Sequence, residues 1–126
     1  MTGIEVVRAS ELARGDSTDG ITRMRAFDRE NTVVSQSRIA PKIVSGWHHH
    51  GTRDLYGFLV SGHLQVEYSQ NGPKTADITP GDFFHIPAGL VHRDVNPDSN
   101  REAIVSTILI GTGPAVINVD SPTKRN

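Results

Sequence analysis

Apolar and polar residues alternate with a period of two along most of this 126-residue chain. Short runs rich in Val, Ile, Thr, Phe and Tyr follow one another, such as TVVSQSRI, LYGFLVSG, HLQVEYSQ and EAIVSTILIG. Turn sequences that contain Gly or Pro separate these runs, such as NGPK, TPGD and IPAG. The pattern predicts many short β-strands, which are typical of a sandwich or barrel. Only ASELARG, near the N-terminus, has a helical pattern, and it is long enough for a single turn.

The chain shows no internal repeat, low-complexity segment or linker, so the sequence predicts one all-β domain. We expect residues 1–30 to form an N-terminal arm and the first strands. Residues 31–120 then form the barrel, and residues 121–126 a disordered tail. The arm could pair with a sheet edge of a second chain, because small open sheets leave edges that need covering. A homodimer is therefore expected.

Charge and composition exclude several kinds of partner. The 13 Lys and Arg residues are balanced by 14 Asp and Glu residues, and no basic stripe indicates nucleic-acid binding. The chain has no Cys, which excludes disulfides and thiolate ligands and fits a reducing compartment. The longest apolar runs are far shorter than the roughly twenty residues of a membrane helix. The N-terminus lacks the apolar segment of a signal peptide, so a cytoplasmic protein is expected.

Three consecutive histidines, in the sequence WHHHG, follow strand-like sequence near the middle of the chain. Side chains alternate along a strand, so His48 and His50 share one face at roughly 6.5–7 Å, and His49 points to the other. Two imidazoles at this spacing can bind one metal ion, which needs nitrogens at about 2 Å. An isolated pair of this kind is also compatible with a solvated polar strand face. The choice between these interpretations depends on the rest of the sequence.

A second motif follows in GDFFHIPAGLVHRDVN and has the pattern G-x5-P-x-G-x2-H-x3-N. Its fixed positions are occupied by Gly81, Pro87, Gly89, His92 and Asn96. With this motif and with His48, His50 and Gly62 at positions of a first motif, the chain resembles the cupins over residues 42–96. Cupins are double-stranded β-helix, or jelly-roll, barrels. The resemblance implies that His48, His50 and His92 converge on one divalent metal ion inside the barrel.

The local sequence agrees with an inward-pointing His92. Gly81 and Asp82 predict a turn that leads into a strand. A second turn follows at residues 87–89, where Gly89 is free to adopt a positive φ. His92 then begins the next strand and can project back into the cavity.

Two positions depart from the cupin pattern. Lys42 stands in place of the first glycine, which affects only a local turn. The glutamate ligand of the family falls on Asp54 or Leu55, and counting back from Gly62 selects Leu55. Strand alternation then places Leu55 and Gly57 on the cavity side. A three-histidine site is therefore favoured over a site in which Asp54 is a fourth ligand.

Three neutral imidazoles leave a divalent ion with its full charge and with open coordination positions. Such a site favours a small organic anion that chelates the ion. Imidazole ligands suit several metals, so Fe(II), Zn, Mn and Ni are not distinguished. The resemblance implies a metal-dependent enzyme, and the three-histidine site resembles the dioxygenase branch of the family, with Fe(II). An isomerase, lyase or cyclase that uses the metal as a Lewis acid stays open, as does a non-catalytic module that binds a small ligand.

Other residues of the cavity are less well determined by the sequence. His85 shares a strand face with Phe83 and Pro87, and it is a candidate acid/base residue if that face lines the cavity. A packing or surface role is the alternative for His85. Alternation does not fix which other side chains line the mouth, for which the candidates are Tyr56, Arg23, Arg25, Gln36 and Arg38.

Overall fold

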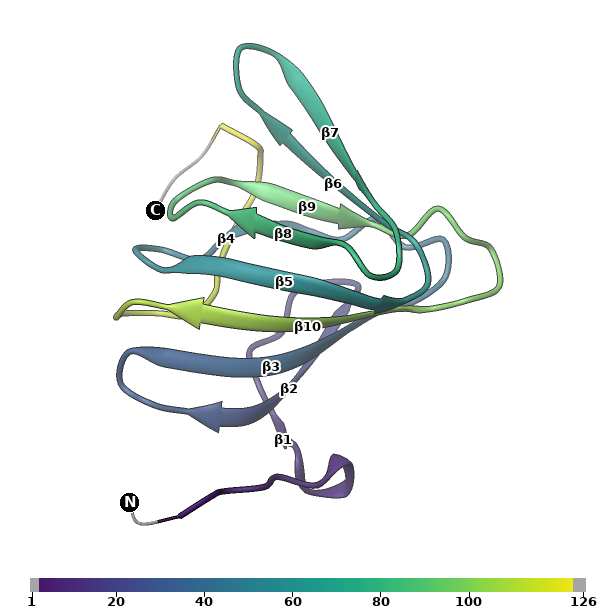
Figure 1. Cartoon of the computed structure of the whole chain (residues 1–126). Coiled ribbons are helices and arrows are strands. Elements are labelled where there is room, and N and C mark those ends of the chain that lie inside the picture. Colours follow the sequence, from purple (N-terminus) through teal and green to yellow (C-terminus); the bar gives the residue numbers. More distant parts are fainter. Residues whose placement is uncertain (1–2, 124–126) are drawn as a thin grey trace.

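A computed structural model describes residues 3–123, which form two antiparallel β-sheets (Figure 1). The six-stranded sheet has the order β1 (Ala13–Arg14), β2 (Ile21–Asp28), β3 (Thr32–Ile39), β10 (Ala103–Ile110), β5 (Asp54–Ser61) and β8 (Phe83–Ile86). The five-stranded sheet has the order β11 (Ile117–Val119), β4 (Trp47–His49), β9 (His92–Val95), β6 (Leu64–Ser69) and β7 (Pro73–Ile78). The predicted helical turn is the 3₁₀ helix η1 (Ala9–Glu11). The all-β prediction is confirmed.

Alternation of side chains builds the core between the two sheets. In β10, which pairs with β3 on one side and β5 on the other, every second residue from Ala103 to Leu109 is buried. The apolar core consists of Ile21, Val33, Ile39, Leu55, Leu59, Leu64, Val66, Ile78, Ile86, Ala103, Val105 and Leu109. Within residues 3–123, no helix is long and apolar enough to cross a membrane.

The turns of the two histidine motifs keep their special backbone conformations. Lys42, which departs from the motif's glycine, has a φ of 62°, so the left-handed turn is retained with a lysine in it. At Gly62, φ is 88°, and a Cβ would lie 2.5 Å from the carbonyl oxygen of Glu102. Only glycine fits there without a shift of the backbone. Gly89 has a φ of 77°, as predicted.

The N-terminal segment before β1 extends past the six-stranded sheet (Figure 1). Ile4 and Val6 are largely exposed in it, at 96% and 59%. Residues 124–126 of the expected disordered tail lie outside the described residues. Pro122 belongs to the described part of that tail and lines a surface cavity beside Trp47.

Candidate metal centre

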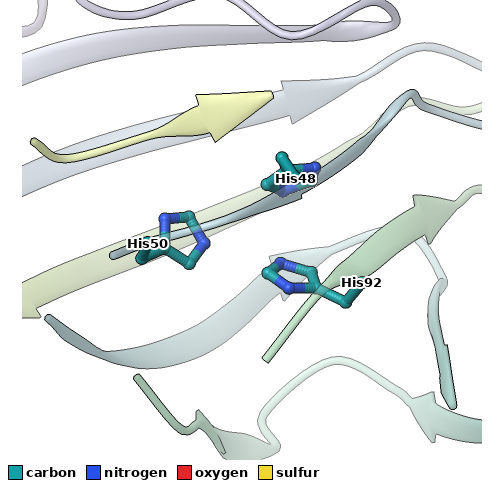
Figure 2. Close-up of side chains that lie close together, drawn as sticks. All are labelled: His48, His50 and His92. Carbon is teal, nitrogen blue, oxygen red and sulfur yellow. The ribbon is translucent and has the colours of Figure 1, made fainter. Parts of the chain in front are cut away.

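Three histidine rings from the five-stranded sheet converge between the two sheets (Figure 2). His48 in β4 lies directly opposite His92 in β9, and His50 follows the end of β4. The ring centroids are 4.3 Å apart for His48–His92, 5.1 Å for His50–His92 and 5.4 Å for His48–His50. One nitrogen of each ring lies within 4.8 Å of those of the others. These side chains could therefore hold one metal ion together.

The backbone fixes the orientation of each ring through its Nδ1 atom. Each Nδ1 lies at hydrogen-bond distance from a carbonyl oxygen: His48 from Gly46 (3.1 Å), His50 from Ala115 (2.9 Å) and His92 from Leu90 (2.9 Å). A carbonyl only accepts hydrogen bonds, so each Nδ1 carries the proton and each Nε2 keeps its lone pair. The Nε2 of His50 is buried and has no hydrogen-bond partner among the described residues. This donor set fits a metal ion, because backbone carbonyls that accept a hydrogen bond from Nδ1–H orient metal-binding imidazoles in this way.

Burial also keeps the three imidazoles in the neutral form that binds metals. Loss of solvent lowers the pKa of His48 well below its usual value of 6.5, and the neighbouring His92 and Arg23 lower it further. Burial, followed by the effect of His92, lowers the pKa of His50 to about 3. The pKa of His92 is lowered mainly by burial, against an opposing effect of Asp94. Ligand protons therefore do not compete with a metal ion near neutral pH.

The cavity beside the histidines is small, and its far wall carries polar side chains among apolar ones. Its volume is about 40 Å³. The six-stranded sheet contributes Arg23, Ser35, Ser37 and Thr107 to its lining. Arg23 is buried, and its Nη1 donates a hydrogen bond of 2.7 Å to Thr18 Oγ1. A fixed cation thus lies at the cavity beside the three neutral rings.

Asp94 is a cavity residue that the sequence analysis did not identify. It lies two residues after His92 in β9 and lines the same cavity. Burial raises its pKa, although His92 and Arg23 oppose this. Alternation counted from His92 would have identified Asp94, because residues two apart in a strand share a face.

The structure does not bring Asp54 to the histidines. Asp54 Oδ1 accepts hydrogen bonds from His85 Nε2 (2.9 Å) and from the Ala88 backbone N–H (3.2 Å), and both lower the pKa of Asp54. Its side chain is 44% exposed. Leu55 lines the cavity instead, as alternation predicted. Asp54 as a fourth ligand is therefore the alternative that the geometry does not support.

The structure places His85 outside the histidine cavity. Phe84 and Ile86 line the histidine cavity, whereas Phe83 and His85 are exposed on the other face of β8. The His85 ring stacks on Tyr56 at a centroid distance of 4.7 Å. His85 does not line this cavity, but it lines a larger neighbouring one, so the acid/base role stays a prediction. The reason for this position is the register with β5, which pairs His85 with the outward-facing Tyr56.

Of the five candidates for the cavity mouth, only Arg23 lines the histidine cavity. Arg25 pairs with Asp16 and Asp28 at the surface. Arg38 forms an ion pair with Glu102. The cationic side chain at the site therefore comes from β2, a strand that precedes both histidine motifs in the sequence.

Comparison with known proteins identifies the fold. A family model described as a cupin domain matches residues 36–109. No curated protein matches the sequence. The polyketide cyclase RemF from Streptomyces resistomycificus has a similar structure, with a TM-score of 0.75, 16% identity and coverage of 96% of this chain and 89% of that one.

Two further structures show the same architecture. One is an uncharacterised protein with a double-stranded β-helix domain from Klebsiella pneumoniae, with a TM-score of 0.73, 14% identity and coverage of 94% of this chain and 100% of that one. The other is an oxalate oxidase in complex with the substrate analogue glycolate, with a TM-score of 0.62, 22% identity and coverage of 71% of this chain. The present chain spans 46% of that oxalate oxidase chain and 34% of each of two matching vicilin chains. At these identities the matches show the double-stranded β-helix fold, which confirms the prediction.

Proposed function

Since the chain belongs to the cupin family, we propose that it is a metal-dependent cupin that acts on a small organic anion. In this proposal, His48, His50 and His92 hold one divalent ion per chain through their Nε2 atoms. The observation that carries the proposal is the convergence of three buried, neutral imidazoles whose Nδ1 atoms are all anchored to backbone carbonyls. A solvated polar strand face would have neither this burial nor this common orientation.

The charges around the cavity support an anionic substrate. A divalent ion bound there would act as a Lewis acid or, as Fe(II), would supply electrons to dioxygen. The three imidazoles carry no charge to offset it, and Arg23 adds a fixed positive charge to the wall. Among the described residues, Asp94 is the one acidic side chain of the lining. A carboxylate, enolate or phenolate oxygen would thus be attracted by both the ion and Arg23.

Among reactions, a dioxygenase with Fe(II) is the first choice, because three histidines leave coordination positions for both a chelating substrate and dioxygen. Isomerisation, dehydration or cyclisation with the metal as a Lewis acid is the second choice. The fold match to a polyketide cyclase is a reason to include cyclisation substrates in the tests. A non-catalytic module that binds a small ligand is the third.

Oxygen uptake separates these three possibilities. The protein, purified without a histidine tag, is reconstituted with Fe(II) or Zn(II) and mixed with a panel of diketones, phenols and thiols. Oxygen consumption that requires Fe(II) supports the dioxygenase. Product formation without oxygen, in the presence of either metal, supports the Lewis-acid enzyme. Binding without turnover of any compound supports the binding module, and failure to retain any metal contradicts the proposal.

We also propose a homodimer, formed through the outer face of the six-stranded sheet. Tyr56, Val60, Phe83 and Ile108 are exposed there, which leaves several large apolar side chains uncovered. Two copies of such a face can cover each other around a two-fold axis. Light scattering should give the mass of two chains for the wild type and of one for Phe83→Asp. Thr75→Asp, on the other sheet, serves as the control that stays dimeric, and a monomeric wild type would contradict the proposal.

A further inference from the structure

A second, larger cavity adjoins the histidine cavity. Its volume is about 430 Å³, and it lies between β7 and β8, the edge strands of the two sheets. Phe84 and Ile86 line both cavities, so these two side chains form a shared wall. The two edge strands are visible in Figure 1, with the β6–β7 hairpin above β8.

The two cavities differ enough in volume to hold different parts of a ligand. At about 40 Å³, the histidine cavity has room for an ion and a few ligand atoms. Small-molecule sites usually have volumes of roughly 300–1,000 Å³. The larger cavity lies within that range, so a substrate that reaches the histidines would place most of its atoms there.

The lining of the larger cavity determines which chemical group it suits. It is mainly apolar, and Val66, Ala76, Ile78, Pro87 and Leu90 contribute to it. Its polar side chains are Tyr68, Gln70 and His85, and no Lys, Arg, Asp or Glu side chain lines it among the described residues. Of these, Tyr68 of β6 lies directly opposite His92 of β9, so the β6 side of the cavity leads to the histidine cluster. The cavity therefore suits a group that is mainly apolar and uncharged.

Phe84 fills the inner end of this cavity because its partner in β5 is a glycine. A Cβ at Gly57 would lie 2.3–2.8 Å from three atoms of the Phe84 ring. The ring thus rests on the bare backbone of β5, in the space between the two cavities. An apolar ring that entered the larger cavity would meet the Phe84 ring on its way to the histidines.

We propose that the larger cavity holds the apolar, ring-sized body of a substrate whose chelating anionic group reaches the ion at His48, His50 and His92. This inference rests on the proposed metal site. It narrows the substrate class to a chelating anion that carries a ring or a branched apolar chain. Small dianions without such a body would leave the larger cavity unused.

Two hydroxamates test the inference, because they share a chelating group and differ in the body attached to it. The protein is loaded with Co(II), and the change in visible absorption reports the binding of acetohydroxamate or benzohydroxamate. We expect benzohydroxamate to bind the wild type at least tenfold more tightly. Ala76→Phe places a ring inside the larger cavity, and it should bring this ratio close to one without changing the affinity for acetohydroxamate. Thr75→Phe, on the opposite face of β7, is the matched control and should keep the wild-type ratio.

Cobalt content, measured first, separates the two levels of the inference. A wild type without bound cobalt would contradict the proposed function and this inference together. If the wild type binds one cobalt per chain but has equal affinities for both hydroxamates, only the proposed role of the larger cavity is contradicted. An unchanged ratio of the two affinities in Ala76→Phe would contradict it as well. Circular dichroism checks the fold of each variant. If Ala76→Phe does not fold, Ala88→Phe fills the same cavity from the other side and is held to the same outcomes.

Discussion

Both faces of the six-stranded sheet carry exceptions to the usual polarity. Its inner face carries Arg23, Ser37 and Thr107 toward the histidine cavity, and all three are buried. Its outer face exposes Phe83 and Ile108 to solvent. In β10, the buried Thr107 and the exposed Ile108 are adjacent residues. Buried polar groups and exposed apolar groups are the informative exceptions in a globular protein. Here the buried polar groups lie at the proposed metal site, and the exposed apolar groups lie on the proposed dimer face.

The inner face itself is divided into two parts. Away from the cavity, Ile39, Leu59 and Ala103 are 0% exposed and form a conventional apolar core with Leu64 of the other sheet. Around the cavity, the same strands present hydroxyl and guanidinium groups. The apolar part accounts for stability, because burial of apolar surface is the main favourable term in folding. Substitutions of the polar side chains around the cavity should therefore affect metal binding more than folding.

The largest expected effect is the loss of metal from His92→Ala. Removal of one of three ligands leaves two imidazoles, so metal content should fall at least tenfold from about one ion per chain. The fold, followed by circular dichroism, should be retained. His63→Ala removes an exposed histidine that pairs with Asp77, and it serves as the control that keeps its metal. Equal metal content in the wild type and in His92→Ala, measured by elemental analysis, would contradict the site.

Adjacent residues of β5 should differ strongly in their effect on stability. Leu59→Ala opens a cavity in the apolar core and should lower the free energy of unfolding by about 2–5 kcal/mol. Val60→Ala, at an outer position that is 48% exposed in the single chain, should lower it by less than about 1 kcal/mol at protein concentrations at which the chain is monomeric. Urea unfolding of both variants measures the difference. Similar losses would show that the outer face is as well covered as the core, as in a tight dimer.

Stability of the metal-free protein should decrease on acidification. The unfolded chain binds protons at histidines near pH 6.5, whereas burial lowers the pKa of His50 to about 3 in the folded chain. Between these values the unfolded state binds more protons, so the free energy of unfolding falls as the pH falls. The slope is at most about 1.4 kcal/mol per pH unit for each such histidine. Urea unfolding from pH 7.5 to 4.5 checks this, and a slope of zero would contradict the burial of neutral rings.

Retention of the metal should also depend on pH. In the loaded protein, metal should be released before the fold is lost, because protons compete for the imidazoles and not for the apolar core. Elemental analysis after dialysis at each pH, alongside circular dichroism, separates the two events. Because burial lowers the pKa of His50 to about 3, release of metal near pH 6.5 from a protein that stays folded would contradict the lowered pKa of these ligands.

The smallest effect is expected for Asp54→Asn. Asp54 is bonded to His85 and Ala88 at the surface, so its substitution should leave the metal content unchanged and shift the thermal midpoint little. Elemental analysis and thermal unfolding check the two expectations. A loss of metal in this variant would show that Asp54 turns inward when the ion binds.

Much of the barrel and the site could be predicted from the sequence. The expected strand TVVSQSRI is β3, and the expected strand that begins at His92 is β9. Strand alternation selected Leu55 over Asp54 as the cavity residue, and the structure confirms this. These predictions succeeded because they depend only on local spacing, which the period of two fixes once one residue of a strand is known to face inward.

Other features were decided by the tertiary structure. In β8, Phe83 and Phe84 are consecutive aromatic residues, so the pattern does not show which face is buried. The pairing of β8 with β5 turns Phe84 inward and His85 outward, and this register is a property of the assembled sheet. The larger cavity exists only because β7 and β8 end two different sheets side by side. The sequence by itself predicted the strands and the common face of His48 and His50 from local periodicity, and its resemblance to the cupins added His92 to them. Only the packing of the two sheets decided which residues form the cavity walls. These residues come from separate strands, and no local pattern specifies which faces of those strands meet.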